Sequence, residues 1–273
     1  YLFASDGTCA TIPVQQLPQV HNPAEGAPYR DLCGFKNGEA ITAALALPPS
    51  LEDGLLFMAT TGGEVKRLKI QDLPGMMAHV FKVMDVEQHD RLGWVFVTSG
   101  QNEMVLVTAQ GQAIRFKESD VRPTGLGAGG MRGIKLGAGD DTVAGVGLAG
   151  ADTHLWTITD TGHAKSTPID DYPIQGRAGS GVITMKLPKD SRCVAAATVG
   201  KLDDTLIVLS SKDRPKSMRL GLAPSIKRAA KSESVMTLYG NEEVAAVVTY
   251  QMIALDQLVP AVPQAEAAEV EPG

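Results

Sequence analysis

The sequence predicts an all-β protein, a propeller-like disc of about five four-stranded blades. Three observations lead to this prediction: short apolar runs, 29 glycines and 16 prolines spread along 273 residues, and one unit that recurs along most of the chain. Many short strands joined by tight turns produce this composition more readily than long helices do. The recurring unit is about 50 residues long, which is close to the length of one propeller blade.

Each copy of the unit begins with an apolar run that ends at a turn residue, followed by a second strand. Successive turn residues are separated by 56, 48, 51 and 51 positions. Glycine or aspartate at each turn indicates a hairpin position with positive φ. A proline phrase such as Leu73-Pro74 or Tyr172-Pro173 then closes each second strand, where a missing donor is tolerated. The five turn residues are Gly7, Gly63, Gly111, Gly162 and Asp213.

The repeats fill residues 1–250, which are predicted to form one domain. Residues 251–273 differ, because prolines, alanines and glutamates stand there without apolar periodicity. Such a composition does not repay the entropy of ordering, so this stretch is expected to be a flexible acidic tail. As a tethered anion it is expected to compete weakly for basic surface elsewhere on the chain.

The net charge of −6 is unevenly distributed along the chain. Residues 1–54 carry two basic and six acidic side chains, and residues 232–273 carry seven acidic side chains and none that is basic. The remaining 23 basic and 18 acidic groups lie in residues 55–231. The middle of the chain is therefore suited to a polyanionic partner.

Several classes of site are not indicated. The three cysteines are odd in number and far apart, and the five histidines lack ligand spacing, so no metal and no cofactor is expected. Gly125–Gly130 fits G-x-G-x-x-G but stands between β patterns, which favours a loop over a nucleotide site. No apolar run reaches the length of a membrane span, so a cytoplasmic location is expected. The strand-like run that opens the chain at Tyr1 suggests an excised fragment.

Basic residues recur at matching places in the repeats. Arg67 and Arg115 lie four positions after their turn glycines, and Lys69 and Lys117 lie six after. With a period of two, Ile114 and Phe116 should face the core while Arg115 and Lys117 point outward. Outward cations on neighbouring blades would form a band that holds DNA through its phosphates. An ordinary solvated face is the alternative.

Two stretches, residues 113–136 and 175–186, closely resemble blades of the C-terminal domain of the bacterial DNA gyrase A protein. The resemblance implies a β-pinwheel that bends and wraps double-stranded DNA around a basic rim. It implies a noncatalytic fragment of an ATP-dependent type IIA topoisomerase, acting on the nucleoid with the gyrase A N-terminal catalytic domain and the gyrase B protein. The chain has no Arg-Tyr dipeptide of the kind that carries the cleaving tyrosine, and no Walker A sequence.

The box Gln-Arg-Arg-Gly-Gly-Lys-Gly of the gyrase family is only partly matched. Residues 175–181 retain Gln175, Arg177, Gly179 and Gly181. An intact box upstream of Tyr1, the A protein of topoisomerase IV, whose C-terminal domain lacks an intact box, and a propeller-like scaffold for protein partners all stay open. The cations expected to contact DNA are Lys66, Arg67, Lys69, Arg115, Lys117, Arg122, Arg132, Lys135, Lys165, Arg177, Lys216 and Arg219.

Overall fold

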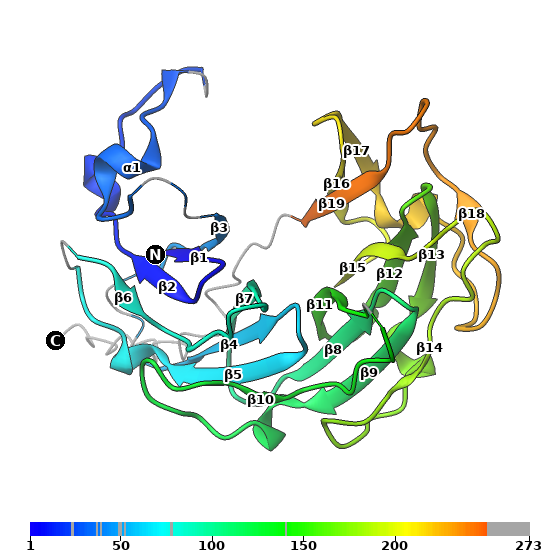
Figure 1. Ribbon diagram of the computed structural model, residues 1–273, viewed down its shortest axis with the longest axis horizontal. Coiled ribbons are helices and arrows are strands. Elements are labelled where there is room, and N and C mark those ends of the chain that lie inside the picture. The colour runs from blue at the N-terminus through cyan, green and yellow to red at the C-terminus, as the bar shows by residue number, and fades with distance from the viewer. Residues whose placement is uncertain are drawn as a thin grey trace, which may run out of the picture.

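The computed structural model describes residues 1–22, 25–36, 38, 40–48, 51, 53–76, 79–139 and 141–249. These residues form short strands joined by turns, and the strands make blades that follow one another in an arc (Figure 1). The predicted all-β, propeller-like pinwheel is confirmed. The predicted acidic tail, residues 251–273, lies outside the described residues.

The blades share one sheet order from the centre of the arc outward (Figure 1). Blade 1 contains β3 (Ile41–Ala44), β1 (Leu2–Ala4), β2 (Thr8–Ala10) and β6 (Phe81–Lys82). Blade 2 contains β7 (Leu92–Thr98), β4 (Leu55–Thr60), β5 (Glu64–Lys69) and β10 (Met131–Arg132). Blade 3 contains β11 (Val143–Ala149), β8 (Glu103–Thr108), β9 (Gln112–Lys117) and β14 (Val182–Ile183). Blade 4 contains β15 (Val194–Gly200), β12 (His154–Thr159), β13 (His163–Pro168) and β18 (Glu233–Ser234), and blade 5 contains β19 (Val244–Thr249), β16 (Thr205–Ser210) and β17 (Pro215–Arg219).

A repeat and a blade are not the same set of strands. Each of repeats two to five builds three strands of its own blade and donates one two-residue strand to the outer edge of the preceding blade. For example, β10 of the third repeat pairs with β5 of blade 2, with Met131 opposite Val65. The sequence repeat predicted four strands per blade. In blades 1 to 4 the fourth strand is donated by the following repeat.

The turn residues confirm the predicted positive φ. The angle is 81° at Gly7, 78° at Gly111 and 54° at Asp213. The donated segment crowds the glycine turns, because a Cβ on Gly7 would lie 2.1 Å from the carbonyl oxygen of Met84. Among the described residues no donated strand pairs with β17 in blade 5, and there the turn residue is aspartate. The glycines thus allow both the turn conformation and the close approach of a neighbouring repeat.

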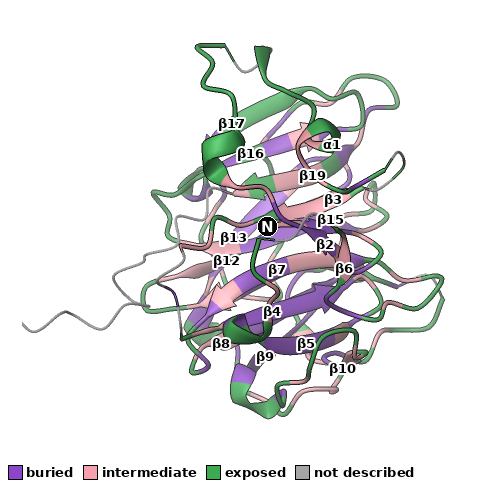
Figure 2. Cartoon of the chain, turned by 90° about the vertical axis from the view of Figure 1, so that its left-hand side faces the viewer, coloured by how far each residue is buried: buried purple, intermediate pink, exposed green. Residues whose placement is uncertain are grey.

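The hydrophobic cores lie between blades. Phe57 of blade 2 packs with Phe116 of blade 3, and Trp156 of blade 4 packs with Leu206 of blade 5. The outer face of blade 1 is covered by the segment around α1 (Tyr29–Leu32), whose neighbour Phe35 is buried. The strands of blades 2 and 3 are largely buried, whereas β17 is mostly exposed (Figure 2). Stacking of neighbouring blades is therefore what buries most of the apolar surface.

A short 3-10 helix follows the second strand of each repeat, and in repeats three to five it leads into a segment that crosses the preceding blade. The helices are η1 (Val14–Gln16), η3 (Ile70–Asp72), η4 (Glu118–Asp120), η5 (Ile169–Asp171) and η6 (Leu220–Leu222). We call residues 121–130 the third strap, residues 172–181 the fourth strap and residues 223–232 the fifth strap. Each strap forms an isolated parallel bridge with the second strand of the preceding blade, as Pro123 does with Arg67. No helix in the described part of the chain is long and apolar enough to cross a membrane.

Candidate nucleic-acid interface

Cations on the second strands occupy three repeated places, counted from the turn residue. The third position holds Lys66, Lys165 and Lys216, the fourth holds Arg67 and Arg115, and the sixth holds Lys69, Lys117 and Arg219. The structure gives these three places different environments.

The sixth position faces solvent. Lys69, Lys117 and Arg219 are all exposed, each at the end of its strand and directly before a 3-10 helix. Ile114 and Phe116, which alternate with the cations in β9, are buried as predicted. The exposed ammonium and guanidinium groups lie on the outer strands of blades 2, 3 and 5.

The fourth position does not face solvent, so the prediction that Arg115 points outward with Lys117 is wrong. The Arg115 side chain is only 13% exposed. Its Nε donates a hydrogen bond to Glu103 at 2.6 Å, and its Nη1 donates to the carbonyl oxygens of Ile169 at 2.8 Å and Tyr172 at 3.3 Å. The fourth strap covers this face of β9, which a strand period cannot reveal. Arg115 therefore links blade 3 to the following repeat.

Arg67 occupies the same kind of position one blade earlier. Its Nε donates to the carbonyl oxygen of Val121, its Nη1 donates to that of Gly100 at 3.4 Å, and Nη1 lies 4.0 Å from the carboxylate of Glu118. Glu118 is fully buried and also accepts hydrogen bonds from Thr98 and Asn102. Burial lowers the pKa of Arg67, and Glu118 opposes that shift. The predicted outward orientation is therefore wrong for Arg67 too.

The third position is buried in two blades. Lys66 and Lys165 have no exposed surface, and each ammonium group donates hydrogen bonds to three main-chain carbonyl oxygens. Burial lowers the pKa of both lysines from 10.5 to about 8, with Asp85 opposing the shift at Lys66. Lys216, at the same position in blade 5, is exposed and donates to the carbonyl oxygen of Val235 at 2.8 Å.

The remaining predicted cations lie on or beside the straps. Arg122, Arg132 and Lys135 are exposed. Arg177 is half-buried, because its Nε donates to the carbonyl oxygen of Asp120 at 3.0 Å and its Nη1 donates to that of Arg132 at 2.9 Å. The structure thus brings Arg122, Arg132, Lys135 and Arg177 together around the outer edge of blades 2 and 3.

The degenerate box lies in the fourth strap. The amide of Gln175 donates to the carbonyl oxygen of Arg115 at 2.7 Å, and the carbonyl oxygen of Gly179 accepts from the amide of Lys135 at 2.9 Å. A Cβ on Gly181 would lie 2.3 Å from the carbonyl oxygen of Ala113, and φ there is 71°. These residues hold the strap against blade 3, and Arg177 extends the contact to blade 2.

The fifth strap contains the end of a basic run, from Lys212 to Lys231, that the sequence indicates as an alternative DNA path without naming the strap's own cations among the expected contacts. Lys227 and Lys231 are exposed there, and the guanidinium of Arg228 lies 5.9 Å from the centre of the Tyr172 ring. Their sequence signal was the cluster of basic residues between 212 and 231. Alignment on the turn residues did not assign them a shared place, because they lie beyond the second strand.

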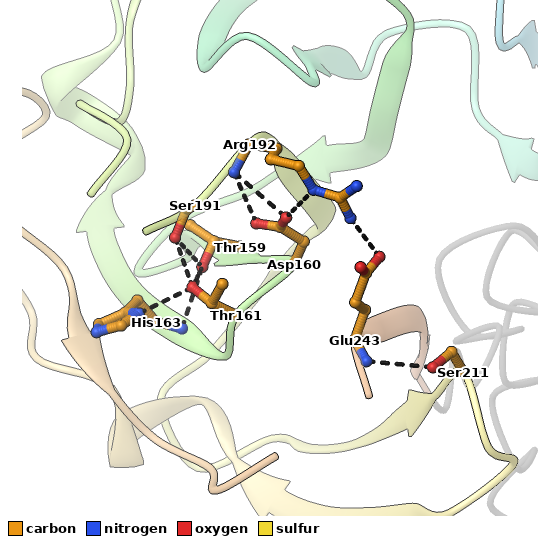
Figure 3. Close-up of polar contacts among 8 residues, drawn as sticks. All are labelled: Thr159, Asp160, Thr161, His163, Ser191, Arg192, Ser211 and Glu243. Atoms are coloured by element: carbon orange, nitrogen blue, oxygen red, sulfur yellow. Dashed lines mark hydrogen bonds and ion pairs between the residues drawn. The ribbon is translucent and has the colours of Figure 1, made fainter. Parts of the chain in front are cut away.

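A second missed group lies at the turn of blade 4, where Arg192 bridges two carboxylates (Figure 3). Its Nε donates to Asp160 at 3.0 Å, and its Nη2 lies 2.5 Å from an oxygen of Glu243, which precedes β19 in blade 5. Arg192 lies two places before the inner strand β15. In blades 2, 3 and 5 the residue at that place is acidic and accepts a hydrogen bond from a residue next to the hairpin turn of its own blade. These acidic residues are Asp90, Asp141 and Glu242. In blade 4 this place holds the cation Arg192, and the acidic partner, Asp160, is at the turn. Arg192 also pairs with Glu243 of blade 5, so its charge is already neutralised within the protein.

The inner strands at the centre of the arc provide few polar or titratable side chains for a ligand site. A cavity of about 480 Å³ there is lined mainly by small residues of the inner strands, with Asp160 and Glu243 at its polar end. Within the described ranges, no group of three or more His, Cys, Asp and Glu side chains is arranged to hold a metal ion.

Comparisons with known proteins agree with this arrangement. The family model described as "DNA gyrase C-terminal domain, beta-propeller" matches residues 102–149, 154–199 and 204–250. The DNA gyrase A protein of Dehalogenimonas lykanthroporepellens is 32% identical over 212 residues, which is 77% of this chain and 26% of the relative. That of Escherichia coli K12 is 34% identical over 207 residues, 76% of this chain and 24% of the relative. The chain spans about a quarter of the length of these curated relatives.

Solved structures show the same fold. The C-terminal domain of DNA topoisomerase IV superposes with a TM-score of 0.83 at 23% identity, covering 90% of this chain and 77% of that one. The DNA gyrase A C-terminal domain superposes with a TM-score of 0.76 at 18% identity, covering 92% and 81%. At these identities the superpositions establish the arrangement of blades.

Proposed function

Because the chain belongs to the DNA gyrase C-terminal domain family, we propose that it is a noncatalytic module that binds duplex DNA and bends it around its outer rim. The observation that supports this most directly is the set of exposed cations on the outer strands of blades 2, 3 and 5 and on or beside the third strap. We call this set the rim cations: Lys69, Lys117, Arg122, Arg132, Lys135, Lys216 and Arg219.

The rim cations suit a phosphate backbone. They lie on blades 2, 3 and 5 of the arc (Figure 1), with blade 4 between the last two, so a duplex that contacts all of them must curve. Bending 20–30 base pairs by 40–90° costs about 1–6 kcal/mol, which phosphate contacts on several blades offset. Contacts to phosphate carry no base information, so binding should show little sequence preference.

In the parent protein the module would serve an ATP-dependent type IIA topoisomerase, together with the gyrase A N-terminal catalytic domain and the gyrase B protein. The curated relatives named above support a gyrase parent over a topoisomerase IV parent, whereas the partial box at Gln175, Arg177, Gly179 and Gly181 fits either. Such a parent acts on the bacterial nucleoid, which gives the module its location in the cytoplasm. A protein-interaction scaffold is the competing function.

A topology assay tests the proposal. The chain is incubated with nicked circular plasmid, the nick is sealed by ligase, and the topoisomers are separated on a gel. Wrapping shifts the linking-number distribution away from that of plasmid sealed alone, and the shift should shrink as salt rises, since phosphate contacts weaken with salt.

Supercoiled plasmid incubated without ligase serves as the second arm of the assay. It should be neither cut nor relaxed by the chain. An unshifted distribution together with no retention on DNA at low salt would favour the scaffold function, and cleavage or relaxation by a pure preparation would contradict a noncatalytic module.

A further inference from the structure

Among the described cations, Lys66 and Lys165 are fully buried. Burying an ammonium group is costly unless its donors are satisfied. Each of these groups has three N–H donors and meets three carbonyl oxygens. At Lys66 the distances from Nζ are 2.7 Å to Val83, 2.7 Å to Gly125 and 2.9 Å to Ala128. Within the part of the chain that the structure describes, neither lysine forms an ion pair, so main-chain oxygens alone satisfy both groups.

The acceptors come from corresponding segments in the two blades. Val83 and Thr184 directly follow the strand that the lysine's own repeat donates to the preceding blade. The other two acceptors lie in the strap of the next repeat. They are Gly125 and Ala128 in the third strap, and Lys227 and Arg228 in the fifth strap. One ammonium group thus bonds both the residue that follows the strand donated by its own repeat and the strap of the next repeat. We call this junction between consecutive repeats a seam.

Blade 3 solves the same problem differently. Its third position is Ile114, which has no donor for the fourth strap. That strap is instead held by its own Arg177, which donates to the carbonyl oxygens of Asp120 and Arg132. The direction of donation is reversed, but in both arrangements a cation without an ion pair among the described residues fixes a strap by bonding main-chain oxygens.

The third and fifth straps need such a restraint and also carry rim charge. The third strap contains Gly125, Gly127, Gly129 and Gly130, so ordering it costs more backbone entropy than ordering other residues would. Arg122 lies within this strap, and Arg132 follows it closely in β10. The fifth strap contains the exposed Lys227 and Lys231.

From these contacts we infer that Lys66 and Lys165 are positioning residues for DNA binding: their buried ammonium groups hold the third and fifth straps so that the strap cations meet the phosphate backbone. The inference rests on the proposed function of the rim. Lys66 and Lys165 themselves touch no phosphate, and their effect on DNA is carried by Arg122, Arg132, Lys227 and Lys231.

The test compares Lys66→Met with Lys69→Met in the full chain. Both variants remove one charge from β5, but only the first removes a buried donor from three carbonyl oxygens. The oxygen of Val83 then has no donor among the described contacts, and those of Gly125 and Ala128 keep only the main-chain amides of Ala128 at 3.3 Å and Asp85 at 3.1 Å. Hydrogen–deuterium exchange of peptides covering residues 121–130 should be faster in Lys66→Met than in the wild type and unchanged in Lys69→Met. Exchange in β12 and β13 of blade 4 should be unchanged in both.

DNA titrations over a range of salt concentrations supply the functional measurement. The slope of log affinity against log salt is negative. Loss of the contacts made by Arg122 and Arg132 should reduce its magnitude by roughly 1.8 in Lys66→Met, against about 0.9 for Lys69→Met. Lys165→Met should lower it through the fifth strap in the same way. Lys189→Met, which changes an exposed loop, serves as the control with the wild-type slope.

The outcomes separate the inference from the proposed function. A wild-type chain that does not bind DNA contradicts the function. A wild-type chain that binds, with an unchanged slope in Lys66→Met, overturns the positioning role, as does a reduced slope without faster exchange in the third strap. If Lys66→Met does not fold, Lys66→Gln replaces it. Its amide has two donors where the ammonium group has three, so exchange in the third strap and the salt slope should change in the same directions by smaller amounts, and wild-type values for both would overturn the positioning role.

Discussion

The seams between blades and the outer rim both collect lysine and arginine, yet the two regions use the same charge in opposite ways. Arg67 and Lys69 lie two residues apart on β5. The guanidinium of Arg67 is bonded to the third strap and lies near the buried Glu118, whereas Lys69 is exposed. The comparison teaches that the position within the repeat, and not the charge, decides whether a cation joins blades or faces a partner.

The seam does not even require a cation. In blade 4 the fourth position is Ser166, whose Oγ donates to the carbonyl oxygens of Leu220 at 3.3 Å and Ala223 at 3.4 Å. Arg115 in blade 3 donates to the corresponding pair, Ile169 and Tyr172. A repeat without arginine therefore keeps the contact to the next strap. The fourth position of blade 4 has no basic residue, yet its serine bonds the pair of carbonyl oxygens that corresponds to the pair bonded by Arg115.

The largest expected effect separates the two regions by stability. Arg67→Met should lower the free energy of unfolding by about 3–5 kcal/mol, because it leaves the buried carboxylate of Glu118 and the carbonyl oxygens of Val121 and Gly100 without their cation. Lys69→Met should change it by less than about 0.5 kcal/mol. Urea denaturation of both variants measures the difference. Equal losses would mean that the seam and the rim are not distinct.

The next effect separates them by DNA binding. Replacing the exposed Lys117, Arg122 and Arg132 together with alanine should reduce the slope of log affinity against log salt by roughly 2.7, since each lost phosphate contact contributes about 0.9. The melting temperature should stay within a few degrees, because exposed side chains contribute little to stability. A charge-matched alanine variant at Arg91, Lys189 and Lys201, which are exposed in loops, is the control. An equal loss in that control would show that only net charge matters.

The last expected effect is a pH dependence confined to the contacts between blades. Burial lowers the pKa of Lys66 and Lys165 to about 8, below their usual value of 10.5. Between these values the unfolded chain binds more protons than the folded chain, so these two lysines make the free energy of unfolding rise with pH in that window.

Urea denaturation at about pH 7 and about pH 9.5 tests this sign. The stability of the wild type relative to the double variant Lys66→Met and Lys165→Met should increase between the two pH values. For the rim pair Lys69→Met and Lys117→Met the difference should stay constant. A wild-type advantage over the seam variant that falls with pH would mean that the ammonium form is favoured at the seam.

Local physical chemistry made much of the molecule readable from sequence. The turn residues Gly7, Gly111 and Asp213 marked the repeats, because few residues accept positive φ. The alternation around Ile114 and Phe116 identified the buried side of β9. Residues 113–136 and 175–186 indicated the family, because these two stretches resemble its blades. Each of these signals is contained within a few neighbouring residues.

The tertiary structure decided which cations remain on the surface. Lys66 is buried by carbonyl oxygens of Gly125 and Ala128, about sixty positions later, and Arg115 is covered by a strap that begins at Tyr172. A strand period describes the two faces of one sheet and contains no information about a strap from the next repeat that crosses the outward face. Because each repeat donates a strand and a strap to the preceding blade, the strap covers part of the outward face of that blade. On β5 and β9 the cations under the strap, such as Arg67 and Arg115, are withdrawn from solvent, and those beyond it, Lys69 and Lys117, stay exposed.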